Sequence, residues 1–110
     1  MEQELVFMIS MKKRLFKFKS EVWVYPGQSA WRFASVDRKL SERIKSDFGA
    51  VSKGWGSLPV SAKIGKTNWK TSIFPDKKSG EYLLPIKASV RKAEGVFDRD
   101  VVSLSIDILV

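Results

Sequence analysis

The sequence predicts a small, mainly β protein: a partly split antiparallel β-barrel of about six strands with two short helices. Apolar and polar residues alternate with a period of two in several short segments, which is typical of half-buried strands. Turn-forming residues separate these segments at intervals of about 8–12 residues. Only two segments have helical spacing. The length of 110 residues fits one domain.

The N-terminal part is predicted to form a hairpin. Residues 1–11 precede the first regular pattern and are interpreted as an extension to a domain spanning 12–110. From Phe16 to Tyr25, apolar residues alternate with mostly charged ones, which indicates a strand with one buried face. Pro26-Gly27 then provides a turn, because proline presets φ and glycine accepts a positive φ. The return strand is predicted over Trp31–Val36.

A helix of about three turns is predicted next. Asp37 suits the N-cap, since a short acidic side chain accepts a hydrogen bond from the first turn. Leu40, Ile44 and Phe48 recur on one face. Gly49 suits a left-handed position at the C-terminus.

The second half is predicted to hold the remaining strands and a second helix. Alternation, proline stops and glycine-rich turns set the limits of these elements. They are strands at Leu58–Ile64, Trp69–Phe74, Glu81–Leu84 and Val101–Val110, a turn at Gly65–Asn68, a loop at Pro75–Gly80, and a helix at Lys87–Glu94 closed by Gly95.

The composition excludes several kinds of chemistry. The chain has no Cys and no His, so it has no Cys or Ser-His nucleophile system, no disulfide and no conventional zinc site. The carboxylates form no convincing catalytic pair, because Asp98 and Asp100 flank a turn. We therefore expect no enzyme, no cofactor and no metal.

The charge is basic and unevenly distributed. The chain carries 20 Lys+Arg against 12 Asp+Glu, a net charge of +8, and residues 12–92 alone carry 19 against 6, a net charge of +13. A basic surface of this kind favours polyanions. The apolar run Leu5–Ile9 is far shorter than the ~20 residues of a membrane span. With no export signal and no cysteine, we expect a cytoplasmic protein without a membrane partner.

Candidate ligand-binding residues lie on the first strand. Lys17, Lys19, Trp23 and Tyr25 share its polar face, so cations and aromatic rings are available together for nucleic acid. Two alternatives remain open. The lysines also suit an edge strand that resists aggregation, and Trp23 also suits a position beneath a helix.

Two further candidate sites contain tryptophan. In the loop Lys53-Gly54-Trp55-Gly56, glycines let backbone amides approach an anion and Lys53 provides charge; the alternative is a tight turn with a buried Trp55. Trp69 with Lys87 and Arg91 would line a pocket for an anionic or planar ligand, with Lys70 as a neighbouring cation. The alternative is a core Trp69, with Arg91 bonded to loop carbonyls.

Three motifs resemble a known bacterial and archaeal family. Residues 53–60 (KGWGSLPV), 69–76 (WKTSIFPD) and 80–91 (GEYLLPIKASVR) resemble domain of unknown function number nineteen-hundred-five, and the resemblance extends over about residues 14–110. It implies a small, partly split β-barrel with two helices and no defined activity. Members occur alone or fused to a bacteriocin-protection-type domain. Members usually have Gly-Asp where this chain has Arg99-Asp100.

A second resemblance concerns topology. The segment from Gly80 to Asp100 is similar to the half-barrel of AbrB-like DNA-binding regulators, which exchange hairpins between two chains. This chain is long enough to close its own barrel, so we expect a monomer rather than a dimer.

The leading hypothesis is a non-enzymatic binding module that holds nucleic acid or another polyanion on a basic face. The alternative is a small-molecule-binding or accessory domain with an internal pocket, whose charge serves solubility only.

Overall fold

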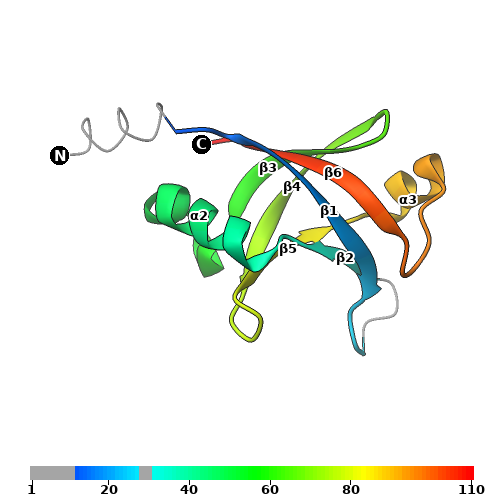
Figure 1. Cartoon of the computed structure of the whole chain (residues 1–110), viewed down its shortest axis with the longest axis horizontal. Coiled ribbons are helices and arrows are strands. Elements are labelled where there is room, and N and C mark those ends of the chain that lie inside the picture. Colours follow the sequence, from blue (N-terminus) through cyan, green and yellow to red (C-terminus); the bar gives the residue numbers. More distant parts are fainter. Residues whose placement is uncertain (1–11, 28–30) are drawn as a thin grey trace.

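The strands close into an antiparallel barrel in the order β1-β2-β5-β4-β3-β6 (Figure 1). The computed structural model describes residues 12–27 and 31–110; the predicted extension, residues 1–11, lies outside this range. The strands are β1 (Leu15–Val24), β2 (Arg32–Ser35), β3 (Leu58–Ile64), β4 (Thr67–Asp76), β5 (Glu81–Pro85) and β6 (Val101–Ile108); the helices are α2 (Arg38–Phe48) and α3 (Ala88–Glu94), and two 3₁₀ turns are η1 (Gly49–Val51) and η2 (Gly54–Gly56). This architecture confirms the predicted fold class.

The two longest strands are shared between the two halves of the barrel. Residues 15–21 of β1 pair with β6, and residues 22–24 pair with β2. In the same way, residues 67–73 of β4 pair with β3, and residues 74–76 pair with β5. Each long strand therefore changes partner along its length, which gives the barrel its partly split character.

The period-two pattern correctly predicts the residues that fill the barrel. Successive strand side chains point to opposite faces, and the inward set is buried. In β1, β3 and β6 its members include Phe16, Val22, Val60, Ala62, Leu104 and Ile106.

The helices lie at opposite ends of the long axis of the molecule (Figure 1). The Asp37 carboxylate caps α2 as predicted, because its Oδ1 accepts a hydrogen bond from the Leu40 amide at 2.9 Å. The prediction of a left-handed Gly49 is wrong: its φ is −56° and the chain continues into η1. The Gly49 carbonyl instead accepts hydrogen bonds from the amide and hydroxyl of Ser52. Gly95 does end α3 with a φ of +63°.

The hairpin of β3 and β4 is tighter than predicted. Thr67 and Asn68 belong to β4 rather than to the turn, and β4 also continues through Pro75 to Asp76, which pair with β5. The Thr67 side chain also bonds to α3, since its hydroxyl donates to Glu94 Oε2 at 2.5 Å. Gly65 suits this turn because its φ is +56°, a backbone conformation that L side chains rarely adopt.

The turn before β6 places an arginine in the left-handed region. Arg99 has a φ of +71°, and its amide donates to the Val22 carbonyl at 2.8 Å. The Asp100 carboxylate accepts from the Phe97 amide at 2.8 Å and closes the turn. The geometry is thus the one that glycine favours, although this chain has arginine.

Replacing Arg99 by glycine is expected to leave stability unchanged or raise the free energy of unfolding by up to about 1.5 kcal/mol. Relief of the left-handed conformation contributes about 1–2 kcal/mol, offset by about 0.5–1 kcal/mol of added chain entropy. Arg99→Val is expected to destabilise, because a β-branched residue tolerates positive φ poorly. Urea denaturation measures the free energy of unfolding of both variants. Equal stability of Arg99→Gly and Arg99→Val would contradict the expectation that the left-handed φ at position 99 favours glycine.

Candidate anion-binding surface

Lysine and serine side chains form rows across the outside of three neighbouring strands. Lys17 on β1 lies opposite Ser105 on β6, and Ser105 lies opposite Lys63 on β3. Lys19 lies opposite Ser103 in the next outward row. Strands are about 4.8 Å apart, so the backbones of Lys17 and Lys63 lie about 10 Å apart on either side of a small hydroxyl. We call this surface the lysine–serine face: Lys17, Lys19, Ser61, Lys63, Ser103 and Ser105.

The lysine–serine face is hollowed. Its six residues line one shallow hollow of about 780 Å³, and Asp107 is the acidic residue among the side chains that line it. The short serines leave space between the longer lysines. Among the described residues, no carboxylate lies within 4.0 Å of the Lys17, Lys19 or Lys63 ammonium groups. The face therefore presents exposed cations and hydroxyl donors together.

An aromatic cluster continues the outer face of the β1–β2 hairpin. The Phe33 ring is buried at its centre, with the centroids of Trp23, Tyr25 and Trp31 at 5.4, 5.7 and 5.9 Å. The indole N–H of Trp23 donates to Ser35 Oγ at 3.0 Å. Trp23 is thus covered by its neighbouring rings, while α2 and α3 pack against β5 and β4. We call these four residues the aromatic cluster: Trp23, Tyr25, Trp31 and Phe33.

A second, smaller hollow lies beside this cluster. It measures about 290 Å³ and is lined by Trp31, Trp69, Pro85 and Ile86, with the cations Arg32, Lys70 and Lys87; we call it the Trp31 hollow. It brings together three of the predicted residues: Trp69, Lys70 and Lys87.

Two predicted members of the pocket have mainly structural contacts. Trp69 is buried, and its indole N–H donates to the Pro85 carbonyl at 3.3 Å. Arg91 does not line the Trp31 hollow; its Nε donates to the Ile86 carbonyl at 3.1 Å. Arg91 thus follows the alternative interpretation of a guanidinium bonded to a loop carbonyl.

Lys70 connects the two hollows. On the outside of the barrel it lies opposite Ser61 of the lysine–serine face, and it also lines the Trp31 hollow. Directly opposed side chains on one sheet face have Cβ atoms about 5 Å apart. Lys70 therefore extends the basic surface from β3 onto β4.

The Lys53–Gly56 loop stands apart from both hollows. The expectation of a buried Trp55 is wrong, because its side chain is 94% exposed. The backbone of Lys53 exchanges hydrogen bonds with Ser57 at 2.9 and 3.0 Å, so the Lys53 amide is used within the turn. Trp55 and Gly56 have φ values of +64° and +78°, and this left-handed path turns the indole outward.

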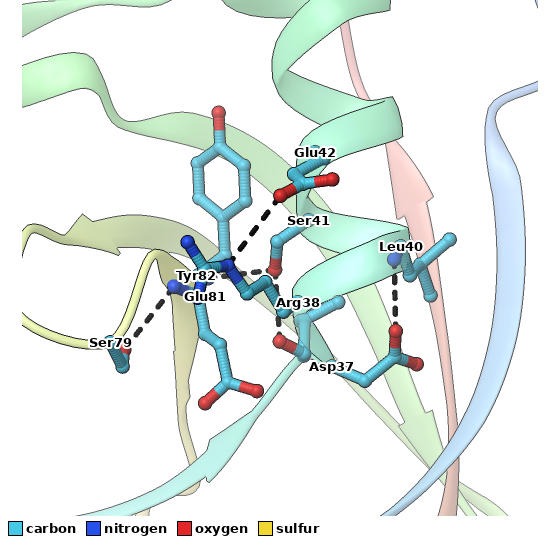
Figure 2. Close-up of polar contacts among 9 residues, drawn as sticks. Asp37, Arg38, Leu40, Ser41, Glu42, Ser79, Glu81 and Tyr82 are labelled. Atoms are coloured by element: carbon cyan, nitrogen blue, oxygen red, sulfur yellow. Dashed lines mark hydrogen bonds and ion pairs between the residues drawn. The ribbon is translucent and has the colours of Figure 1, made fainter.

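A polar network fixes α2 to the sheet (Figure 2). Ser41 is 2% exposed; its hydroxyl donates to the Val36 carbonyl and accepts from the Tyr82 amide, both at 2.9 Å. Burial raises the pKa of the Tyr82 phenol above its ordinary value. A hollow of about 340 Å³ beside this network mixes three cations with three acids: Arg38, Lys45, Lys77, Glu42, Asp76 and Glu81. Because these charges balance, the hollow favours a structural role in holding α2 on the sheet over the binding of an anion.

Residues 12–27 and 31–110 contain neither a cluster of metal-ligating side chains nor a helix that could span a membrane. No group of three Asp or Glu side chains there is placed to hold a metal ion. None of the helices in this part of the chain has the length and apolar character needed to cross a membrane.

The fold and surface define a small β-barrel domain with a hollowed basic face. The family model described as domain of unknown function (DUF1905) matches residues 18–106, so the chain belongs to this family. The match contains most of the lysine–serine face and the whole aromatic cluster. No curated protein matches the sequence.

Proposed function

We propose that the chain is a non-enzymatic binding module that holds nucleic acid, or another phosphate polyanion, on its lysine–serine face. The observation that supports this most strongly is the row Lys17–Ser105–Lys63 with Lys19 beside it, across one hollow surface. Three exposed ammonium groups surround serine hydroxyls there, and Asp107, which lies opposite Ser61, is the acidic residue that lines the same hollow.

The chemistry of this face matches a phosphate backbone. Lysines neutralise phosphates and release condensed counterions, which is the main source of sequence-independent affinity. Serine hydroxyls donate hydrogen bonds to phosphate oxygens. Lys17 and Lys19 point the same way along β1, about 7 Å apart, so they reach different phosphates of one strand. Such contacts position a polymer without reading its sequence.

A second candidate function is binding of a small anionic, planar ligand. The Trp31 hollow favours it, because aromatic walls and the cations Lys70 and Lys87 lie together there. Its volume of about 290 Å³ is at the lower end of ligand pockets, which measure about 300–1,000 Å³. This function predicts tight binding of a free small ligand without help from Lys17, Lys19 or Lys63.

A triple substitution tests the proposed function. The face variant replaces Lys17, Lys19 and Lys63 by alanine; a control variant of equal charge replaces Lys39, Lys77 and Lys78, which are exposed on α2 and on the turn after β4. Binding of mixed-sequence DNA, RNA and inorganic polyphosphate is measured by fluorescence anisotropy or competition. Circular dichroism confirms that both variants are folded.

The face variant is expected to bind on the order of 100-fold more weakly at about 50 mM salt, because three phosphate contacts are removed. The control variant is expected to keep its affinity within about threefold, since only long-range charge is lost. Equal losses in the two variants would show that net charge, and not this face, governs binding. Absence of binding to every polyanion would overturn the proposal.

A further inference from the structure

We infer that the bound nucleic acid is single-stranded and that the Trp31 hollow takes one of its unpaired bases. This inference rests on the proposed function. It begins from the exposure of Trp31: its indole is 52% exposed, although tryptophan is among the most apolar side chains and is highly buried on average. Base rings stack on such exposed aromatic side chains irrespective of sequence.

The Trp31 ring is held in position before any ligand arrives. It stacks on Phe33 with an angle of 28° between the ring planes and 5.9 Å between centroids. Phe33 is in turn fixed by Trp23 and Tyr25 at 5.4 and 5.7 Å. A preorganised ring loses little conformational freedom on binding. The aromatic cluster therefore serves as the support of a stacking surface.

The size of the hollow favours one base over a duplex. Its volume is about 290 Å³, with Trp31, Trp69 and Pro85 among its walls. The bases of a duplex are stacked and paired inside, so a base reaches such a hollow only after it is flipped out of the stack. An unpaired base of a single strand enters without that cost.

The basic surface connects the hollow to the lysine–serine face. Lys70 and Lys87 line the Trp31 hollow, so their ammonium groups are available to the phosphates of a nucleotide whose base stacks there. Lys70 also lies opposite Ser61, so the sugar–phosphate backbone leaving the hollow meets the lysine–serine face next. One nucleic-acid strand thus makes stacking contacts at Trp31, immediately before β2, and phosphate contacts across β4, β3, β6 and β1.

Trp31→Ala tests the inference against four probes: single-stranded oligo-dT, a mixed duplex, an abasic single strand and inorganic polyphosphate. Wild type is expected to bind oligo-dT more tightly than the duplex or the abasic strand. Trp31→Ala is expected to weaken oligo-dT binding about 10-fold, because base–aromatic stacking is lost, and to leave polyphosphate and abasic binding unchanged. Trp31→Phe is expected to retain most of the affinity. Trp55→Ala, which removes an exposed indole outside both hollows, is the matched control and is expected to change nothing.

The outcomes separate this inference from the proposed function. If Trp31→Ala and Trp31→Phe both bind oligo-dT as wild type does, while the lysine triple variant still loses affinity, the inference is overturned and the proposed function stands. Equal wild-type affinity for duplex and oligo-dT also overturns it. If a free mononucleotide binds as tightly as oligo-dT, independently of Lys17, Lys19 and Lys63, the hollow serves a small ligand and the inference is overturned. If wild type binds none of the four probes, both fall.

Discussion

Replacing Phe48 by alanine is expected to lower the free energy of unfolding by about 3–5 kcal/mol. Phe48 is the last residue of α2 and is fully buried in the core. Its removal loses apolar burial and leaves a cavity, because the surrounding strands relax only in part. The Arg14 guanidinium, 5.9 Å from the ring centroid, loses its aromatic contact as well. A domain of this size is stable by about 5–15 kcal/mol, so the loss is a large share of the total.

Urea denaturation of wild type, Phe48→Ala and a control measures this effect. The control is Lys39→Ala on the exposed face of the same helix, which is expected to change stability by no more than about 0.5 kcal/mol. A loss below about 1 kcal/mol for Phe48→Ala would show that α2 is not docked on the barrel as described.

Replacing Ser41 by alanine is expected to cost about 1–3 kcal/mol. Ser41 is 2% exposed, and its hydroxyl serves two backbone groups at once: the Val36 carbonyl and the Tyr82 amide. Alanine leaves both groups without this partner at a buried position, and a buried group without a hydrogen-bond partner pays its full desolvation cost. The loss therefore exceeds that of one ordinary hydrogen bond.

Ser46→Ala is the matched control for Ser41→Ala, because Ser46 is exposed on the same helix. It isolates the buried hydrogen bonds from the effect of serine on helix propensity, which is shared by both variants. Thermal unfolding followed by circular dichroism compares them. If Ser41→Ala is no less stable than Ser46→Ala, the network in Figure 2 contributes nothing to stability.

The direction of each strand side chain could be predicted from the sequence, but the neighbours of each strand could not. Alternation in the first strand correctly placed Lys17 and Lys19 on the outside of the barrel. The pairing of β6 with both β1 and β3 joins segments far apart in the chain, and period two carries no information about it. Lys63 was therefore missed as a member of the lysine–serine face, although its outward position was predictable.

The burial of the tryptophan side chains could likewise be predicted only in part from the sequence. An apolar ring in a glycine-rich loop favours a buried position, yet Trp55 is exposed because two successive left-handed residues turn it away from the barrel. Trp31 and Arg32 were missed as site residues because the Trp31 hollow forms only where β2, β5 and β4 meet. The predicted pocket beside Trp69 pointed to this place, and the structure adds Trp31 and Arg32 to its lining.

The salt dependence of oligo-dT binding tests the role of the lysine–serine face most directly. The logarithm of the association constant falls linearly with the logarithm of salt concentration, with a slope of about −0.7 per phosphate neutralised on a single strand. Removal of Lys17, Lys19 and Lys63 is expected to make the slope less steep by about 2, since three such contacts are lost. The control variant at Lys39, Lys77 and Lys78 is expected to keep the wild-type slope. Equal slopes for wild type and the face variant would contradict the account.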